Sequence, residues 1–125
     1  MNQRRPATIL VVDDEEPIRE MLTRFLALDR YTVIGAATAE QALRVVGEQP
    51  VDLILLDLHM PGLYDGEQLL FLLRDRGNDV PIIVVSGWVD DEAMVNRPDC
   101  VYAVLKKPIA SLVLLDTVRQ ALTAA

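Results

Sequence analysis

Two patterns of apolar residues alternate along the 125 residues of this chain. In the first pattern, most residues of a short run are apolar, which is typical of strands covered on both faces of a parallel sheet. In the second pattern, apolar residues recur every three or four positions, which predicts a helix with one buried face. The five strand-like runs lie at residues 8–12, 31–36, 51–56, 81–85 and 101–105.

Helices are expected between these runs and after the last one. The first helix begins near Pro17, which suits a first helical turn, and the second is capped by Thr38. Asp65 caps a third helix, which stops at Gly77. The fourth helix, at residues 90–96, is short or irregular because a proline follows it closely. The predicted buried face of the fifth helix contains Leu112, Leu115, Val118 and Leu122.

This alternation of strands and helices predicts an α/β domain with right-handed crossovers. We expect a flavodoxin-like, doubly wound three-layer sandwich, with five helices and a five-stranded parallel sheet in the order 2-1-3-4-5. No linker, repeat or low-complexity segment interrupts the pattern. Residues 1–125 are therefore expected to form a single domain, with its core at about residues 8–123.

Polar residues that can take part in chemistry follow four of the five apolar runs. Asp13 and Asp14 follow the first run, Asp57 the third, Ser86 the fourth and Lys107 the fifth. Parallel strands present their carboxyl ends at the same edge of a sheet, and the first and third strands are neighbours in the expected order. The sequence therefore predicts that these five side chains lie together at one edge.

Phosphoryl transfer to an aspartate is the chemistry that suits this set of residues. Three adjacent carboxylates repel one another unless a cation joins them, and oxygen ligands alone favour Mg²⁺. Asp57 can then accept a phosphoryl group, whose oxygens meet the charge of Lys107 and the hydroxyl of Ser86. Taken singly, an acid at a strand end is more often a helix cap, and a serine before a glycine is often part of a turn.

The composition narrows the possible partners. A net charge of -7 and a pI near 4.6 argue against direct binding of nucleic acid, which depends on clustered Lys and Arg. The chain has one cysteine and no cluster with zinc spacing, so a reducing compartment is expected. Because no apolar stretch is long enough for a signal peptide or a membrane span, we expect a cytoplasmic protein without a membrane partner.

Five pieces of sequence carry a resemblance to a known family: VVDDEEPIRE, LILLDLHMPG, DGEQLL, VVSGW and LKKP. At these residues, and over almost its whole length, the chain resembles the receiver domain of two-component response regulators. The resemblance implies that Asp57 is the phosphoacceptor, which takes a phosphoryl group from a histidine kinase or a small phosphodonor. It also implies a phosphorylation switch or relay that is not an enzyme, since such a domain catalyses only its own phosphorylation and dephosphorylation.

The resemblance further implies the ligands of the metal ion. Asp14 and Asp57 would coordinate Mg²⁺ directly, Asp13 would act mostly through a water molecule, and His59 would contribute its backbone carbonyl. The His59 side chain would border the phosphoryl group, and we expect it to influence how fast the acyl phosphate is hydrolysed.

The segment before Lys107 departs from the family pattern. The resemblance implies that Lys107 and Ser86 contact the phosphoryl group and that the peptide bond between Lys107 and Pro108 is cis. Three residues before this lysine, the family usually has a Tyr or Phe that moves inward on phosphorylation, but this chain has Val104. Tyr102 is expected on the same face as Val104 by strand alternation. How the signal would leave the domain is therefore open.

Apolar surface is expected at two helices. The unbroken apolar run at residues 69–73, centred on Phe71, is too wide for one buried face, and Val113 and Leu114 similarly widen the last helix's stripe. Scattered leucines are common on protein surfaces and need no partner. Otherwise such surfaces would serve a downstream effector protein, an output domain or a homodimer. The partner that supplies the phosphoryl group would be a sensor histidine kinase or a phosphotransfer protein. Trp88 is a natural fluorescence reporter near the site.

Two other functions compete with this interpretation. A haloacid-dehalogenase-type phosphatase also uses an Asp, a Ser or Thr, and a Lys, but it needs a second Asp two residues after the nucleophile as general acid. That position is His59. The second alternative is a receiver-like module that binds a partner without being phosphorylated, which Val104 keeps open.

Overall fold

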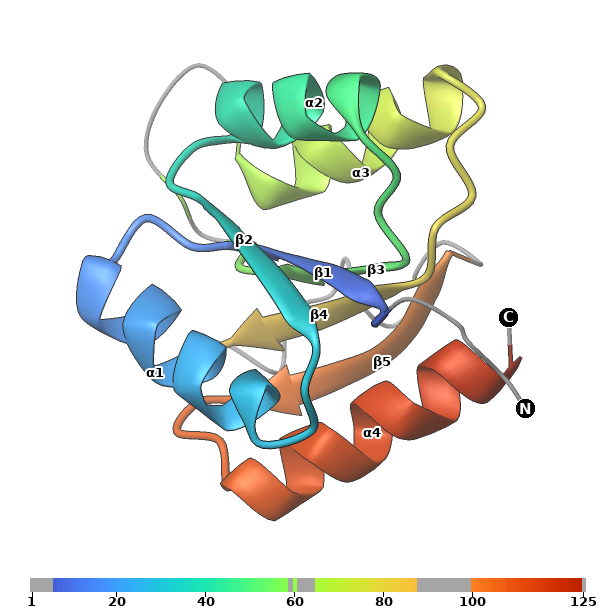
Figure 1. Ribbon diagram of the computed structural model, residues 1–125. Helices are drawn as coiled ribbons and strands as arrows, with labels where there is room; N and C mark the ends of the chain where they lie inside the picture. The colour runs from blue at the N-terminus through green and yellow to red at the C-terminus, as the bar shows by residue number, and fades with distance from the viewer. Residues whose placement is uncertain (1–5, 59, 61–64, 88–99, 125) are drawn as a thin grey trace.

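The computed structural model in Figure 1 describes residues 6–58, 60, 65–87 and 100–124. Five parallel strands form one sheet in the order β2-β1-β3-β4-β5, so the predicted order is confirmed. The strands are β1 (Thr8–Val12), β2 (Thr32–Ala36), β3 (Leu53–Leu56), β4 (Ile82–Ser86) and β5 (Val101–Lys106). The helices within the described residues are α1 (Glu16–Ala27), α2 (Ala39–Glu48), α3 (Gly66–Asp75) and α4 (Ser111–Ala124).

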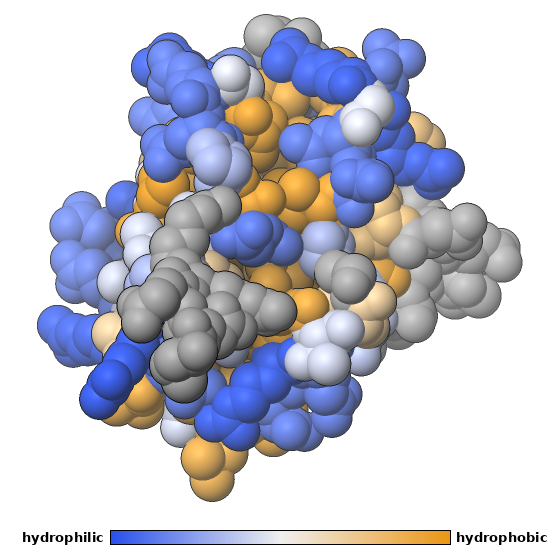
Figure 2. Space-filling model, turned by 45° about the vertical axis from the view of Figure 1, so that its right-hand side comes forward, coloured by the Kyte–Doolittle hydropathy of each residue, from blue (hydrophilic) through white to orange (hydrophobic). Residues whose placement is uncertain are grey.

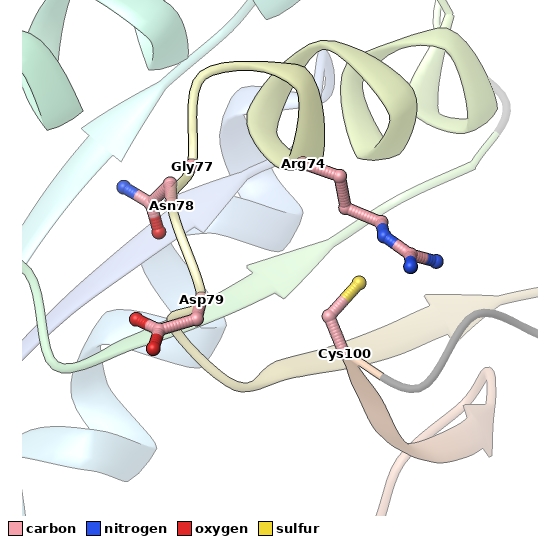
Figure 3. Close-up of a pocket in the computed structure, with 5 residues that line it drawn as sticks. All are labelled: Arg74, Gly77, Asn78, Asp79 and Cys100. Carbon is pink, nitrogen blue, oxygen red and sulfur yellow. The ribbon is translucent and has the colours of Figure 1, made fainter.

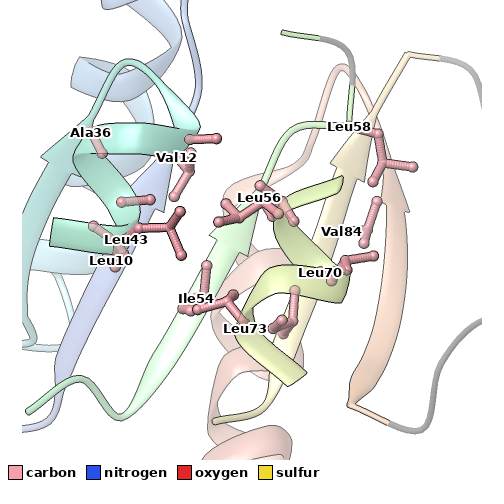
Figure 4. Packing of buried hydrophobic residues seen from close by; sticks show 14 of the residues in the cluster. Leu10, Val12, Ala36, Leu43, Ile54, Leu56, Leu58, Leu70, Leu73 and Val84 are labelled. Carbon is pink, nitrogen blue, oxygen red and sulfur yellow. The ribbon is translucent and has the colours of Figure 1, made fainter. Parts of the chain in front are cut away.

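The sheet is the middle layer of a three-layer sandwich. Helices α2 and α3 cover one face, and α1 and α4 cover the other (Figure 1). Alternate residues of β1 enter the two cores: Leu10 and Val12 pack toward α2 and α3, while Ile9 and Val11 pack toward α1 and α4. Figure 4 shows the first of these cores. Because both faces are covered, all five residues of β1 are buried, which explains its continuous apolar sequence.

Local hydrogen bonds place the helix starts where the sequence predicted them. The Thr38 side chain accepts a hydrogen bond from the amide of Gln41. Asp65 and Gln68 form a capping box, in which each side chain accepts from the other's backbone amide. Gly77, after α3, has a φ of 76°, a conformation that glycine adopts without steric cost. These caps satisfy backbone groups that a helix end leaves without partners.

The exposed residue of α3 fits the prediction that its apolar run is too wide to be fully buried, whereas the buried face of α4 differs from the one predicted. In α3, Leu69, Leu70 and Leu73 are buried, so Phe71 is the large side chain of this run that is exposed, at 67%. In α4, Leu114 is buried and Leu112 is 78% exposed, the reverse of what the sequence suggested. The side chains buried in α4 are Leu114, Leu115, Val118 and Ala121. Several stripes of an apolar helix can face the sheet, and tertiary packing selects one of them.

Figure 2 shows one face of the surface, coloured by the hydropathy of each residue. On this face, hydrophilic side chains lie mainly toward the margin, and apolar areas lie between them near the middle of the view. Within the described residues, no helix has the length and apolar composition required to cross a bilayer.

A β-bulge interrupts the pairing of β4 with β5. Ile82 pairs with Val101 and Ile83 pairs with Ala103, so Tyr102 is left between two paired residues. The pairing of Ala103 and Val104 is regular, and the expected position of Tyr102 on the face of Val104 stays a prediction. Tyr102 is 37% exposed. The predicted helix at residues 90–96 lies outside the described residues and stays a prediction.

Candidate functional site

Backbone hydrogen bonds continue the sheet one residue beyond its strands at the carboxyl edge. The amide of Asp13 donates to the carbonyl of Ala36 at 3.1 Å, and the amide of Asp57 donates to that of Val12 at 2.9 Å. Both aspartates are thus held at strand ends by the ladder that forms the core. This is why their side chains leave the sheet at the same edge.

Three carboxylates meet at this edge. Asp13, Asp14 and Asp57 each offer a carboxylate oxygen, and these oxygens lie within 4.8 Å of one another. Asp13 and Asp57 are buried, with 1% and 5% of their surface exposed, whereas Asp14 is exposed. A group of three acids that is buried on one side and open on the other is accessible to a ligand from solvent.

Lys107 brings a positive charge to these acids. Its Nζ lies 2.9 Å from Oδ2 of Asp13, to which it donates a hydrogen bond, and 3.6 Å from Oδ2 of Asp57. Burial acts to lower the pKa of Lys107, but the hydrogen bond to Asp13 and the negative charges of Asp13, Asp57 and Glu15 outweigh it. The pKa is therefore raised above its ordinary value of 10.5, and the side chain is an ammonium ion at neutral pH.

The position of Lys107 is fixed through its own backbone. Its amide donates to the carbonyl of Ser86 at 2.9 Å, directly after the pair formed by Ser86 and Lys106. Ser86 is the last residue of β4 and is buried, with 1% of its surface exposed. The peptide bond between Lys107 and Pro108 is cis, as expected.

Arg19, a residue that the sequence did not single out, holds the backbone of Asp13. Oδ1 of Asp13 accepts a hydrogen bond from the amide of Glu15 at 2.9 Å, and the backbone carbonyl of Asp13 accepts one from Nη1 of Arg19 at 2.8 Å. Arg19 lies on α1, beside Gly35 of β2. The presence of a glycine inside a strand, a common sign of close approach by another group, was the one available signal.

The start of α3 packs directly against the backbone of Asp57. A methyl group placed on Gly66 would overlap the carbonyl oxygen of Asp57 and the Cα of Leu58. The amide of Gly66 donates to the carbonyl of Leu58 at 3.1 Å. Since no side chain fits at this position, Gly66 is required for the observed approach of α3 to the segment that bears Asp57.

Within the described residues, four of the predicted site residues form one cluster of charged side chains: Asp13, Asp14, Asp57 and Lys107. Its all-oxygen donors and its excess of negative charge suit a hard cation. His59 and Trp88 lie outside the described residues, as does the loop at residues 61–64.

A pocket of about 370 Å³ lies at the other edge of the sheet. It is lined by Arg74, Gly77, Asn78, Asp79 and Cys100. Arg74 belongs to the end of α3, and Asp79 and Cys100 precede β4 and β5 (Figure 3). The pocket is thus separate from the acidic cluster, which lies at the carboxyl ends of the strands.

The fold and this cluster together define a receiver-type signalling domain, and known proteins support the assignment. A CheY-like receiver domain from Methanospirillum hungatei has a TM-score of 0.88 and 26% identity, with 96% of each chain covered. The response regulator TrrA from Thermotoga maritima, whose structure is a complex with Mg²⁺-BeF, has a TM-score of 0.80 and 28% identity. That comparison covers 92% of this chain and 98% of TrrA.

Residues 9–119 match the family model of the response regulator receiver domain, and the chain belongs to this family. It is 39% identical to the hydrogenase transcriptional regulatory protein HoxA of Cupriavidus necator over 96% of this chain. It is 34% identical to the response regulator protein FleR of Pseudomonas aeruginosa over 90% of this chain. The chain spans 25% of the length of HoxA and 24% of that of FleR.

Proposed function

We propose that this receiver domain is switched by phosphorylation of Asp57, in a reaction that requires Mg²⁺. The observation that carries the proposal is the position of the Lys107 ammonium group, 3.6 Å from Oδ2 of Asp57, beside two further carboxylates. A carboxylate without such a partner is a weak phosphoryl acceptor, because the incoming group is itself negatively charged. Residues 8–123 would form the single core of the domain.

Asp14 and Asp57 would hold the metal ion directly, and Asp13 would act through water. The backbone carbonyl of His59 would be a further ligand. Support comes from the three carboxylate oxygens within 4.8 Å of one another and from the Mg²⁺-BeF complex of TrrA. Both carboxylate oxygens of Asp13 already accept protein hydrogen bonds, which favours a less direct part for this residue. When bound, Mg²⁺ supplies positive charge that offsets the repulsion between carboxylates and phosphoryl oxygens.

The chemical step would form a bond between an oxygen of Asp57 and the phosphorus atom. The bond from phosphorus to the histidine nitrogen of the kinase, or to the leaving oxygen of a small phosphodonor, would break, and the leaving atom would keep the electron pair. Lys107 would transfer its hydrogen bond from Asp13 to a phosphoryl oxygen, and the Ser86 hydroxyl would donate to another. These movements would reposition the loops that follow β4 and β5.

The partners follow from this chemistry. A sensor histidine kinase or a phosphotransfer protein would supply the phosphoryl group, and an effector protein or an output domain would read it. The names of the relatives support both roles: HoxA is a transcriptional regulatory protein, and CckA of Brucella abortus, 37% identical over 93% of this chain, is a sensor kinase. A homodimer would be another route of output. No turnover of an external substrate is expected.

Incubation with acetyl phosphate and Mg²⁺, followed by intact-mass measurement, tests this function. We expect one phosphoryl group per wild-type chain, none on Asp57→Asn and none in the presence of EDTA. Asp52→Asn is the matched control and should be labelled normally, because Asp52 precedes β3 at the other edge.

An unlabelled wild-type chain would contradict the proposal and favour the binding module without phosphorylation. Continuous release of phosphate from phosphomonoesters would instead indicate the phosphatase.

A further inference from the structure

We infer that Arg19 is a positioning residue of this site. It holds the backbone of Asp13 from α1 and thereby keeps the carboxylates of Asp13 and Asp14 close to that of Asp57. This inference rests on the proposed function, namely that the acids bind Mg²⁺ and that Lys107 turns to the phosphoryl group.

The side chain of Arg19 crosses from α1 to the end of β1. Nη1 donates to the carbonyl of Asp13 at 2.8 Å, and Arg19 is partly buried. Side chains on a helix lean toward its N-terminus, so a residue in the first turns of α1 can reach back to the corner before the helix. A Cβ on Gly35 would lie 3.6 Å from Cδ of Arg19 and 3.8 Å from Nε. The side chain therefore passes closely over β2 on its way to Asp13.

All four polar atoms of Asp13 have hydrogen-bond partners. The amide bonds to Ala36, and Oδ1 and Oδ2 accept from Glu15 and Lys107. The backbone carbonyl accepts from Arg19. Of these four bonds, the one from Lys107 is given up when the ammonium group turns to a phosphoryl oxygen. The bond from Arg19 uses no side-chain oxygen of Asp13, so it can persist through the exchange while the carboxylate is free to interact with a metal-bound water.

The charge of Arg19 contributes as well. Three carboxylates face one ammonium group at this edge, and their mutual repulsion opposes the converged arrangement when no metal is bound. A guanidinium group that is fixed at the corner between Asp13 and α1 offsets part of this repulsion. It does so without occupying a carboxylate oxygen that a metal ion would need.

Three variants test the inference: Arg19→Met, Arg19→Lys and, as matched control, Arg24→Met on the exposed side of the same helix. Isothermal titration calorimetry should show that Arg19→Met lowers the affinity for Mg²⁺ on the order of tenfold, which is typical when a residue that supports metal ligands is lost. The affinity of Arg24→Met should be unchanged. Arg19→Lys, which keeps a charged donor, should recover part of the affinity. Amide hydrogen exchange at Glu15, measured without metal, should be faster in Arg19→Met only.

Each outcome decides the inference. Wild-type Mg²⁺ affinity together with wild-type exchange at Glu15 in Arg19→Met would overturn it. So would equal losses in Arg19→Met and Arg19→Lys that follow a general loss of thermal stability, because these would show a merely structural role. If the wild-type chain itself binds no Mg²⁺, the proposed function fails, and the exchange at Glu15 alone decides whether Arg19 positions the corner.

Discussion

Acidic side chains lie at both edges of the sheet, in opposite surroundings. At the amino edge, Oδ2 of Asp52 accepts a hydrogen bond from the amide of Thr8 at 2.7 Å, so this carboxylate is matched by a backbone donor. At the carboxyl edge, Lys107 pairs with Asp13 and Asp57, and the carboxylate of Asp14 lies close to both of these acids. The carboxylate of Asp52 stabilises the fold, because it has a fixed hydrogen-bond donor. The arrangement at the carboxyl edge leaves negative charge in excess, which an incoming cation can use.

The same contrast holds for the backbone around these acids. Asp52 joins the start of β3 to the start of β1, and its carboxylate helps to align two central strands. The acids of the carboxyl edge are instead held through their backbones. Arg19 bonds to the carbonyl of Asp13, Gly66 packs against the backbone of Asp57, and the hydrogen bonds of the sheet fix both residues. Four experiments test this difference between the two edges of the sheet.

The largest effect is expected at Gly66. Gly66→Ala forces a methyl group into the backbone of Asp57 and Leu58, so the free energy of unfolding should fall by about 3 kcal/mol and labelling by acetyl phosphate should slow. Urea denaturation and intact-mass kinetics measure these two effects. The control is Gly47→Ala in α2, where a methyl group meets nothing within 4 Å. It should stabilise the protein by about 0.5 to 1 kcal/mol, because alanine favours a helix. Equal stability of the two variants would refute the packing argument.

The next effect is expected at Asp14, which is exposed and adds charge to the carboxyl edge. Asp14→Asn should weaken Mg²⁺ binding by about tenfold or more, since it removes a ligand and a charge. In EDTA the variant should be at least as stable as the wild type, because repulsion is reduced. Titration calorimetry and thermal melts test both points. Glu16→Gln, a neighbouring exposed acid outside the cluster, should leave the affinity unchanged, and a similar loss there would assign the effect to overall charge.

A smaller effect is expected at the amino edge. Asp52→Ala leaves the amide of Thr8 without its acceptor, so the free energy of unfolding should fall by about 1 to 2 kcal/mol. The affinity for Mg²⁺ should remain at the wild-type value. Asp79→Ala, an exposed acid just before β4, should change neither quantity. A loss of Mg²⁺ affinity in Asp52→Ala would show that the two edges are not independent.

The smallest change concerns pH. The pKa of Lys107 is raised in the folded protein, so the stability that its ion pairs contribute is fully present below about pH 10.5 and is lost as the pH rises through the folded-state pKa. The difference in stability between the wild type and Lys107→Met should therefore be constant from pH 6 to 9. It should shrink at higher pH. Denaturation curves over this range measure it, and a difference that varies between pH 6 and 9 would contradict the raised pKa.

Within the described residues, the sequence was sufficient to predict the helices, the strands and the edge at which the acids meet. A central strand such as β1 is buried on both faces, so its apolar run is continuous and easy to recognise. The caps at Thr38 and Asp65 involve residues three positions apart, which makes them local signals. Parallel pairing then places Asp13 and Asp57 at neighbouring strand ends, because the first and third strands are neighbours in the expected flavodoxin-like order.

Other features depend on contacts between distant segments. Leu112 and Leu114 are equally apolar, and the docking of α4 on the sheet decides which is buried. The bulge at Tyr102 arises from the pairing of β4 with β5. Arg19 bonds to a backbone carbonyl, and Gly66 packs against a backbone segment, so neither partner has a side chain that could mark it in the sequence. The chemistry of side chains and the period of apolar residues can be recognised in the sequence. Contacts to the backbone, and the choice of which apolar stripe is buried, are decided only when the layers pack together.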